Sequence, residues 1–276
     1  MGEVAEVFFL PMSGRGQRLA LHHRPTSGAV RGAIVYVHPM AEEMNKSRRM
    51  AALQARAFAR AGYAVLQIDL LGCGDSSGDF GDAGWADWVS DIVAAAAWLR
   101  ERHDAPLTLW GLRAGCLIAA EAAQCIETPA DFVFWQPTPS GKLVLQQFLR
   151  LRLATEMQGA SAKALMESLR SQLMAGEAVE VAGYRLSPAL AAGLERASLL
   201  PPVTPARVTW LEVSTRDAAA LLPASATAIG RWQQAGCHVH AAVAQGPSFW
   251  QTTEIEEAPA LIDATLAAAC LEEAIA

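Results

Sequence analysis

A short turn between an apolar strand pattern and an Ala- and Leu-rich helix pattern contains the residues best placed to do chemistry. It reads Gly111-Leu112-Arg113-Ala114-Gly115. In the related pattern Gly-x-Ser-x-Gly, the central serine is a nucleophile held at the start of a helix. Here the centre is Arg113, and a guanidinium stays protonated at any working pH. Because loss of a triad serine costs on the order of 10⁶ in turnover, the sequence argues against ordinary serine chemistry at this turn.

The other two members of a Ser-His-acid triad would lie on loops after later strands. The base should be a histidine after the last strand, but that loop contains Phe249 and Trp250 and no histidine. His238 and His240 lie inside the strand itself, and we interpret both as structural. Asp217 follows the preceding strand at the spacing of an orienting acid. It fits equally well as a cap of the next helix, because a short carboxylate there accepts backbone N–H bonds.

The loop after residue 38 would supply backbone donors to an oxyanion in such an enzyme. It reads HPMAEEMNKS (38–47). Pro39 has no N–H to donate, although Met40 does. Two carboxylates, Glu42 and Glu43, follow directly. We therefore expect an altered oxyanion loop that places negative charge near Arg113.

An arginine at this turn permits two interpretations. A helix N-terminus already favours negative charge, and a guanidinium adds a fork of donors suited to a carboxylate or phosphate ligand. Alternatively, Glu42, Glu43 or Asp217 could converge on Arg113 and fill the site with an internal ion pair. A buried arginine without a partner would be costly, so one of the two must hold if Arg113 is not solvated. The sequence leaves both open.

Further candidates for ligand contact follow neighbouring strands. Phe249 and Trp250 could form an apolar or sugar-stacking wall, although single aromatic residues are more often core. Ser140 and Lys142 could act as a nucleophile and its base. The candidate ligand-binding residues are therefore Met40, Glu42, Glu43, Arg113, Ser140, Lys142, Phe249 and Trp250. The candidates for a reactive nucleophile are Ser47, Ser140, Ser214 and Cys73.

Strand and helix patterns alternate along the chain and place these loops at one edge of a sheet. An N-terminal antiparallel hairpin precedes apolar runs typical of buried parallel strands, whose carboxyl ends collect ligands. Ser47 is the expected cap of a helix over 47–62. Residues 138–205 contain three helical patterns and no convincing buried strand. The runs that predict parallel strands are 32–38, 63–70, 106–110, 131–137, 207–214 and 238–245.

These patterns predict the α/β class, specifically an α/β-hydrolase fold with a mostly parallel, doubly wound sheet and an inserted helical cap. We expect residues 1–137 and 206–276 to form the core and residues 138–205 to form the cap. A chain of 276 residues with 52 % apolar residues can fill such a core.

Charge and cysteine content exclude several functions. A net charge of −6 gives no general attraction to nucleic acid or to an anionic bilayer. No apolar run approaches the roughly 18–20 residues of a membrane span, and the first residues lack the basic region of a secretory signal. Five scattered cysteines and two histidine pairs show no metal-ligand spacing. We therefore expect a cytoplasmic protein with reduced thiols, no metal and no cofactor.

Several stretches together resemble one family over nearly the whole chain. They are HPMAEEMNKSRRM, DLLGCGDSSGDF, WGLRAG, WQPTPSGK with FLRLRLATEM, and GPSFWQTTEIEEAP. The combination resembles the exosortase A system-associated hydrolase 2 family of bacterial α/β-hydrolase relatives. This resemblance implies an association with protein sorting and exopolysaccharide export, and it makes the arginine of the turn a family feature. It implies no substrate.

Three functions are therefore carried forward. Ester or thioester hydrolysis follows from analogy of fold alone. A non-catalytic protein could instead bind an anionic small molecule through Arg113. The third is a module that binds a partner protein, such as a component of the export system.

Overall fold

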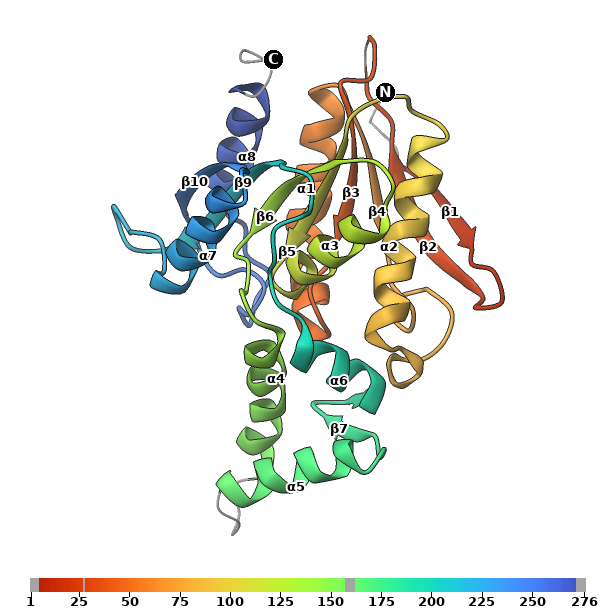
Figure 1. The fold of residues 1–276 in the computed structure, drawn as a ribbon, viewed down its shortest axis with the longest axis vertical. Coiled ribbons are helices and arrows are strands. Elements are labelled where there is room, and N and C mark those ends of the chain that lie inside the picture. The colour runs from red at the N-terminus through yellow and green to blue at the C-terminus, as the bar shows by residue number, and fades with distance from the viewer. Residues whose placement is uncertain (1–4, 27, 157–161, 272–276) are drawn as a thin grey trace.

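The computed structural model describes residues 5–26, 28–156 and 162–271 (Figure 1). Within them, eight strands form one sheet in the order β1-β2-β4-β3-β5-β6-β9-β10. The pairs from β4 to β10 are parallel, and the antiparallel hairpin β1–β2 joins the sheet at β4. The strands are β1 Glu6–Pro11, β2 Gln17–His23, β3 Gly32–Val37, β4 Tyr63–Ile68, β5 Leu107–Leu112, β6 Ala130–Trp135, β9 Arg207–Ser214 and β10 His238–Gln245.

Helices cover both faces of this sheet, as its apolar runs predict, because a strand buried on both faces needs apolar side chains on both. Val35 and Val37 face a cluster shared with α2, α3 and α7, while Ile34 and Tyr36 face a cluster shared with α1 and α8. The fold is therefore the predicted doubly wound α/β architecture. The helices are α1 Glu42–Arg60, α2 Trp85–Arg100, α3 Ala114–Cys125, α7 Pro223–Gln234 and α8 Pro259–Leu271, with a 3-10 turn η1 at Phe80–Asp82.

The segment between β6 and β9 contains the three expected helices, and it extends beyond the carboxyl edge of the sheet (Figure 1). It also contains a hairpin, β7–β8, where the sequence suggested no strand. Each of its strands is only three residues long, too short for an alternating pattern to stand out. Residues 157–161, where the first two helical patterns were expected to end and begin, lie outside the described residues. The elements are α4 Gly141–Glu156, α5 Ala162–Met174, β7 Val179–Val181, β8 Tyr184–Leu186 and α6 Pro188–Arg196.

The helix expected over 47–62 begins five residues earlier, at Glu42, so the assignment of Ser47 as its cap is wrong. Ser47 is buried inside α1 and its hydroxyl donates to the carbonyl of Glu43. The true N-cap is Ala41, which makes no side-chain cap bond. Glu42 and Glu43 therefore form the first turn of α1, where the helix dipole favours acidic residues.

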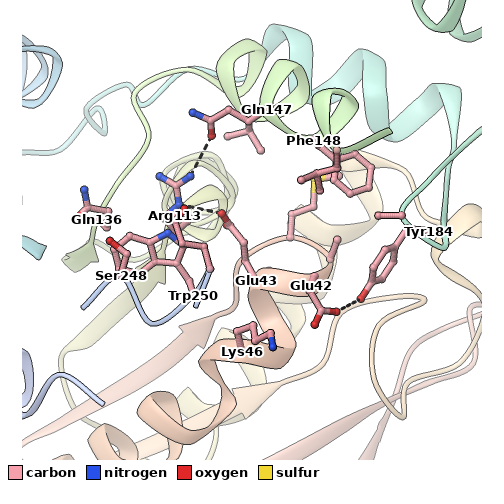
Figure 2. Close-up of a pocket in the computed structure, with 16 residues that line it drawn as sticks. Glu42, Glu43, Lys46, Arg113, Gln136, Gln147, Phe148, Tyr184, Ser248 and Trp250 are labelled. Carbon is pink, nitrogen blue, oxygen red and sulfur yellow. Dashed lines mark hydrogen bonds and ion pairs between the residues drawn. The ribbon is translucent and has the colours of Figure 1, made fainter. Parts of the chain in front are cut away.

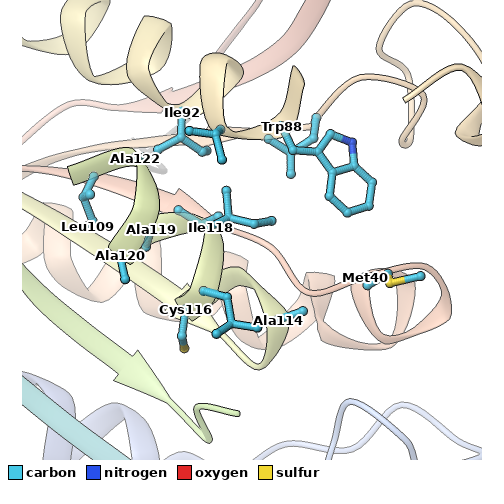
Figure 3. Packing of buried hydrophobic residues seen from close by; sticks show 14 of the residues in the cluster. Met40, Trp88, Ile92, Leu109, Ala114, Cys116, Ile118, Ala119, Ala120 and Ala122 are labelled. Atoms are coloured by element: carbon cyan, nitrogen blue, oxygen red, sulfur yellow. The ribbon is translucent and has the colours of Figure 1, made fainter. Parts of the chain in front are cut away.

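The turn around Arg113 depends on two glycines that let α3 approach the sheet closely. A side-chain carbon at Gly111 would lie 2.7 Å from the backbone of Cys116, and one at Gly115 would collide with the carbonyl oxygen of Val37 in β3. Cys116 is fully buried, as expected for a small apolar residue on the inner side of α3 (Figure 3). Close packing on both sides thus fixes the start of α3 and the direction of the side chain that precedes it.

Candidate functional site

A cavity of about 530 Å³ lies at the carboxyl edge of the sheet, between the strand ends and α4 with the β7–β8 turn (Figure 2). One side is formed by the start of α1, the turn after β5 and the loop after β10. Apolar side chains of α4 form the other side. The lining residues are Met40, Ala41, Glu42, Glu43, Lys46, Arg113, Gln136, Val144, Gln147, Phe148, Leu151, Ala182, Tyr184, Ser248, Trp250 and Gln251.

Arg113 is the polar centre of this cavity (Figure 2). Its Nε donates to Glu43 Oε1 at 3.2 Å, its Nη1 to Thr138 Oγ1 at 3.2 Å and its Nη2 to Gln147 Oε1 at 3.1 Å. The guanidinium carbon also lies 5.7 Å from the centre of the Trp250 ring. These hydrogen bonds use three of the five N–H donors of the guanidinium. Internal pairing is therefore present, and two donors remain.

Strained backbone is concentrated around the same cavity. Among the described residues, five that are not glycine have positive φ, and four of them line the cavity. They are Ala41 at φ 53°, Arg113 at φ 55°, Gln136 at φ 43° and Ala182 at φ 49°. The first three directly follow or lie close to the ends of the neighbouring strands β3, β5 and β6. Strain of this kind clusters at functional sites because the surrounding structure must hold it in place.

The two acidic residues of the first turn of α1 have different partners. Burial raises the pKa of Glu43, and the charge and hydrogen bond of Arg113 oppose that rise. Glu42 instead accepts from the Tyr184 hydroxyl at 3.2 Å and from Asn45. Burial and the neighbouring Glu42 raise the pKa of Tyr184 to about 12. Of the three acids considered as partners of Arg113, the structure selects Glu43.

The loops that would hold a triad base and acid supply no hydrogen-bond partner to Arg113 among the described residues. Ser248 and Trp250 of the loop after β10 line the cavity, whereas Phe249 is fully buried against Trp135. Asp217 is exposed and accepts a hydrogen bond from Gln245 Nε2 at 2.8 Å. It does not cap α7, whose N-cap is Leu222, so that alternative is wrong. The group that faces Asp217 is therefore the side-chain amide of Gln245 and not a histidine imidazole.

The other residues proposed from the sequence lie away from the cavity lining. Ser140 forms a bridge with Ser198 and Lys142 is exposed on α4. Ser214 accepts a hydrogen bond from the backbone of Arg216, and burial raises the pKa of the Cys73 thiol. His238 and His240 are exposed strand residues. Of the eight candidate ligand-binding residues, those that line the cavity are Met40, Glu42, Glu43, Arg113 and Trp250.

Two polar partners of Arg113 were missed by the sequence reasoning. Thr138 directly follows the Gln-Pro that ends the β6 region, and Gln147 is on α4. A signal for Gln147 was present: Val144, Gln147, Phe148 and Leu151 share one face of α4, so a single polar side chain interrupts an apolar stripe.

In the part of the chain that the structure describes, no three His, Cys, Asp or Glu side chains are grouped in a way that could hold a metal ion. No helix there is both long and apolar enough to cross a membrane.

A mostly parallel sheet with helices on both faces and a strained strand–turn–helix elbow at its carboxyl edge defines an α/β-hydrolase fold. Comparison with protein families is consistent with this class. The model described as "serine aminopeptidase, S33" matches residues 28–188, more than half of the chain. The chain belongs to this family. No curated protein matches it in sequence.

Solved structures of low sequence identity share the fold. Est1E from Butyrivibrio proteoclasticus, solved with bound ferulic acid, has a TM-score of 0.67 at 14 % identity, covering 97 % of this chain and 99 % of Est1E. The α/β-hydrolase GrgF from Penicillium sp. sh18 has a TM-score of 0.61 at 15 % identity, covering 96 % and 97 %. A thermostable carboxyl esterase from Bacillus coagulans has a TM-score of 0.59 at 15 % identity, covering 89 % and 91 %.

Proposed function

We propose that this protein is a member of the S33 family that binds an anionic ligand with an apolar body and does not hydrolyse it through an elbow nucleophile. The observation that carries the proposal is the guanidinium of Arg113, which stands at the elbow in place of a nucleophile and faces the 530 Å³ cavity. We further propose a cytoplasmic role beside an exopolysaccharide-export or protein-sorting system. That part rests on the motif resemblance and on the scattered cysteines.

The donors around the elbow favour a carboxylate, sulfonate or phosphate. Arg113 keeps two N–H donors beyond those used by Glu43, Thr138 and Gln147. Lys46 also lines the cavity, and its ammonium donates to the carbonyl of Thr253. The first N–H groups of α3 have no partner within the helix and add positive potential beside Arg113.

The remainder of the cavity suits an apolar body. Val144, Phe148 and Leu151 of α4 face Trp250 of the opposite wall across the cavity. A site with one charged anchor and apolar walls is typical of small-molecule recognition. The volume is within the roughly 300–1,000 Å³ of sites that hold drug-sized ligands. A ligand of one or two rings with one acidic group matches these features.

Hydrolysis is disfavoured because Arg113 replaces the elbow nucleophile and no histidine stands beside the hydroxyl of the lining among the described residues. Ser248 is the one lining residue with a hydroxyl on an sp³ carbon, and no histidine lines the cavity among the described residues. An aliphatic hydroxyl needs an adjacent base to become a nucleophile. The proposed role is therefore recognition, with no acyl-enzyme step.

The test is calorimetric titration with ferulate, an aromatic carboxylate of suitable shape, on the wild type and on Arg113→Ala. Hydrogen bonds to charged groups contribute about 1.5–3 kcal/mol, so Arg113→Ala should weaken binding about tenfold or more. Arg150→Ala removes an exposed guanidinium of α4 outside the lining and should bind like the wild type. Equal binding by Arg113→Ala and the wild type would refute the proposal.

Catalysis is tested in parallel with a fluorophosphonate probe and p-nitrophenyl esters, using a functional serine hydrolase as the positive control. We expect no selective labelling and no turnover above that of heat-unfolded protein. Rapid labelling of a single residue, for example Ser248 of the cavity lining, would identify an enzyme and contradict the proposal.

A further inference from the structure

A second cavity, of about 210 Å³, lies under α1 and is separate in its lining from the cavity around Arg113. Its floor is a row of register neighbours across three strands: Leu21 of β2, Gln67 of β4 and Tyr36 of β3. Its roof comes from α1, where Ala51 and Ala52 are too small to fill the space. The lining residues are Leu21, Tyr36, His38, Met44, Arg48, Ala51, Ala52, Gln67, Ile68 and Asp69.

Two of the polar residues in this lining have their hydrogen bonds within the protein. The two ring nitrogens of His38 pair with the Pro39 carbonyl at 2.8 Å and with the Leu70 N–H at 3.1 Å. An imidazole that donates on one side and accepts on the other is neutral. Burial also lowers the pKa of His38. Asp69 is paired with Arg48 through Oδ2 and Nη2 at 2.9 Å.

Three other side chains of the lining, Tyr36, Gln67 and Arg48, keep donors for a ligand. Tyr36 is only 5 % exposed, and its hydroxyl has no hydrogen-bond partner within the described ranges. Burial raises the pKa of that phenol far above its usual value, so it keeps its proton. Gln67 accepts from His23 through Oε1, and its NH₂ group has no hydrogen-bond partner in the described part of the chain, so it can donate to a ligand. Arg48 gives only one of its donors to Asp69.

We propose that this cavity is a binding site for a short-chain carboxylate. The acidic group accepts hydrogen bonds from the Tyr36 hydroxyl, the Gln67 amide and Arg48. The alkyl chain packs on Leu21, Met44 and Ile68. A ligand oxygen that accepts from the Tyr36 hydroxyl inside the cavity adds a hydrogen bond to the affinity. The volume is below the range of sites for drug-sized ligands, so the ligand must be small.

Two methionines provide separate reporters for the two cavities. Met44 lines the small cavity and Met40 lines the cavity around Arg113. In protein labelled with ¹³C at methionine methyl groups, sodium butyrate should shift the Met44 resonance and leave that of Met40 in place. No shift at Met44, or a shift at Met40 alone, would overturn the proposal.

Variants identify the groups that bind the carboxylate. Tyr36→Phe keeps the ring that contacts Trp110, at 4.3 Å between centroids, and should raise the dissociation constant of butyrate about tenfold or more. Ala52→Leu places a larger side chain in the cavity and should abolish the Met44 shift. An unchanged butyrate affinity in a folded Tyr36→Phe variant would refute the assignment of the hydroxyl.

Two further comparisons define the ligand class and the site. Butyramide has the same shape as butyrate without its charge and should bind more weakly; equal affinity would refute a carboxylate site. Butyrate should still shift Met44 in Arg113→Ala. Loss of that shift would place butyrate at the elbow instead. The small cavity can therefore be confirmed or refuted whatever the outcome for the site around Arg113.

Discussion

Replacing Arg113 by glycine and by alanine separates the cost of the elbow backbone from the contribution of the guanidinium. Arg113 has φ 55° and ψ −119°, a conformation that glycine adopts freely and other residues only with strain. Both variants lose the same contacts to Glu43, Thr138 and Gln147. The difference between their unfolding free energies therefore reports the backbone of the turn.

The magnitude follows from two opposing effects. Strain in this region costs on the order of 1–3 kcal/mol, while the flexibility of glycine in the unfolded chain costs about 0.5–1 kcal/mol. Arg113→Gly should thus be more stable than Arg113→Ala by on the order of 1 kcal/mol. The assay is equilibrium unfolding in urea. The midpoints of the two variants are compared after checking that their unfolding free energies depend equally on the urea concentration.

A matched control tests whether glycine acts through the conformation at this position. Ala123 lies within α3, where glycine should destabilise the protein by about 1 kcal/mol. The sign of the glycine effect should therefore reverse between the elbow and the helix that follows it. If Arg113→Gly were no more stable than Arg113→Ala, the turn would not be strained and the reasoning would be refuted.

Three more predictions follow from the shifted pKa values of Glu43, His22 and Cys73. Benzenesulfonate stays anionic over the whole pH range. It should bind more tightly as the pH falls through the raised pKa of Glu43, because protonation of Glu43 frees the guanidinium of Arg113. Calorimetry should show that Glu43→Gln binds benzenesulfonate more tightly than the wild type at pH 7 and loses this pH dependence. Burial and the neighbouring His103 lower the pKa of His22 from 6.5 to about 4. The unfolded chain therefore takes up the proton first, and stability should fall between pH 6.5 and about 4; an NMR titration giving a His22 pKa near 6.5 would contradict this. Iodoacetamide should label exposed Cys125 and spare Cys73 in the native protein, because burial raises the pKa of the Cys73 thiol. Mass spectrometry of the labelled peptides measures the labelling of each cysteine.

Local patterns allowed much of the fold to be predicted. Apolar runs such as 32–38 and 207–214 identify strands buried on both faces, and they appear as β3 and β9. The short β7–β8 hairpin and the early start of α1 were missed. Strands of three residues carry no usable period, and the positive φ of Ala41, which sets the start of α1, has no sequence signal in an alanine.

The sequence by itself determined the order of the strands of the main sheet and of the helices that cover it, the glycine spacing of the elbow and the absence of a serine there, because these depend on residue type and local periodicity. Only the tertiary structure decided which acid pairs with Arg113. Glu43 is 70 residues away along the chain and Gln147 is 34 residues away. Their approach is set by how α1 and α4 pack at the carboxyl edge of the sheet, and side-chain partners at such separations depend on helix position and rotation rather than on local pattern.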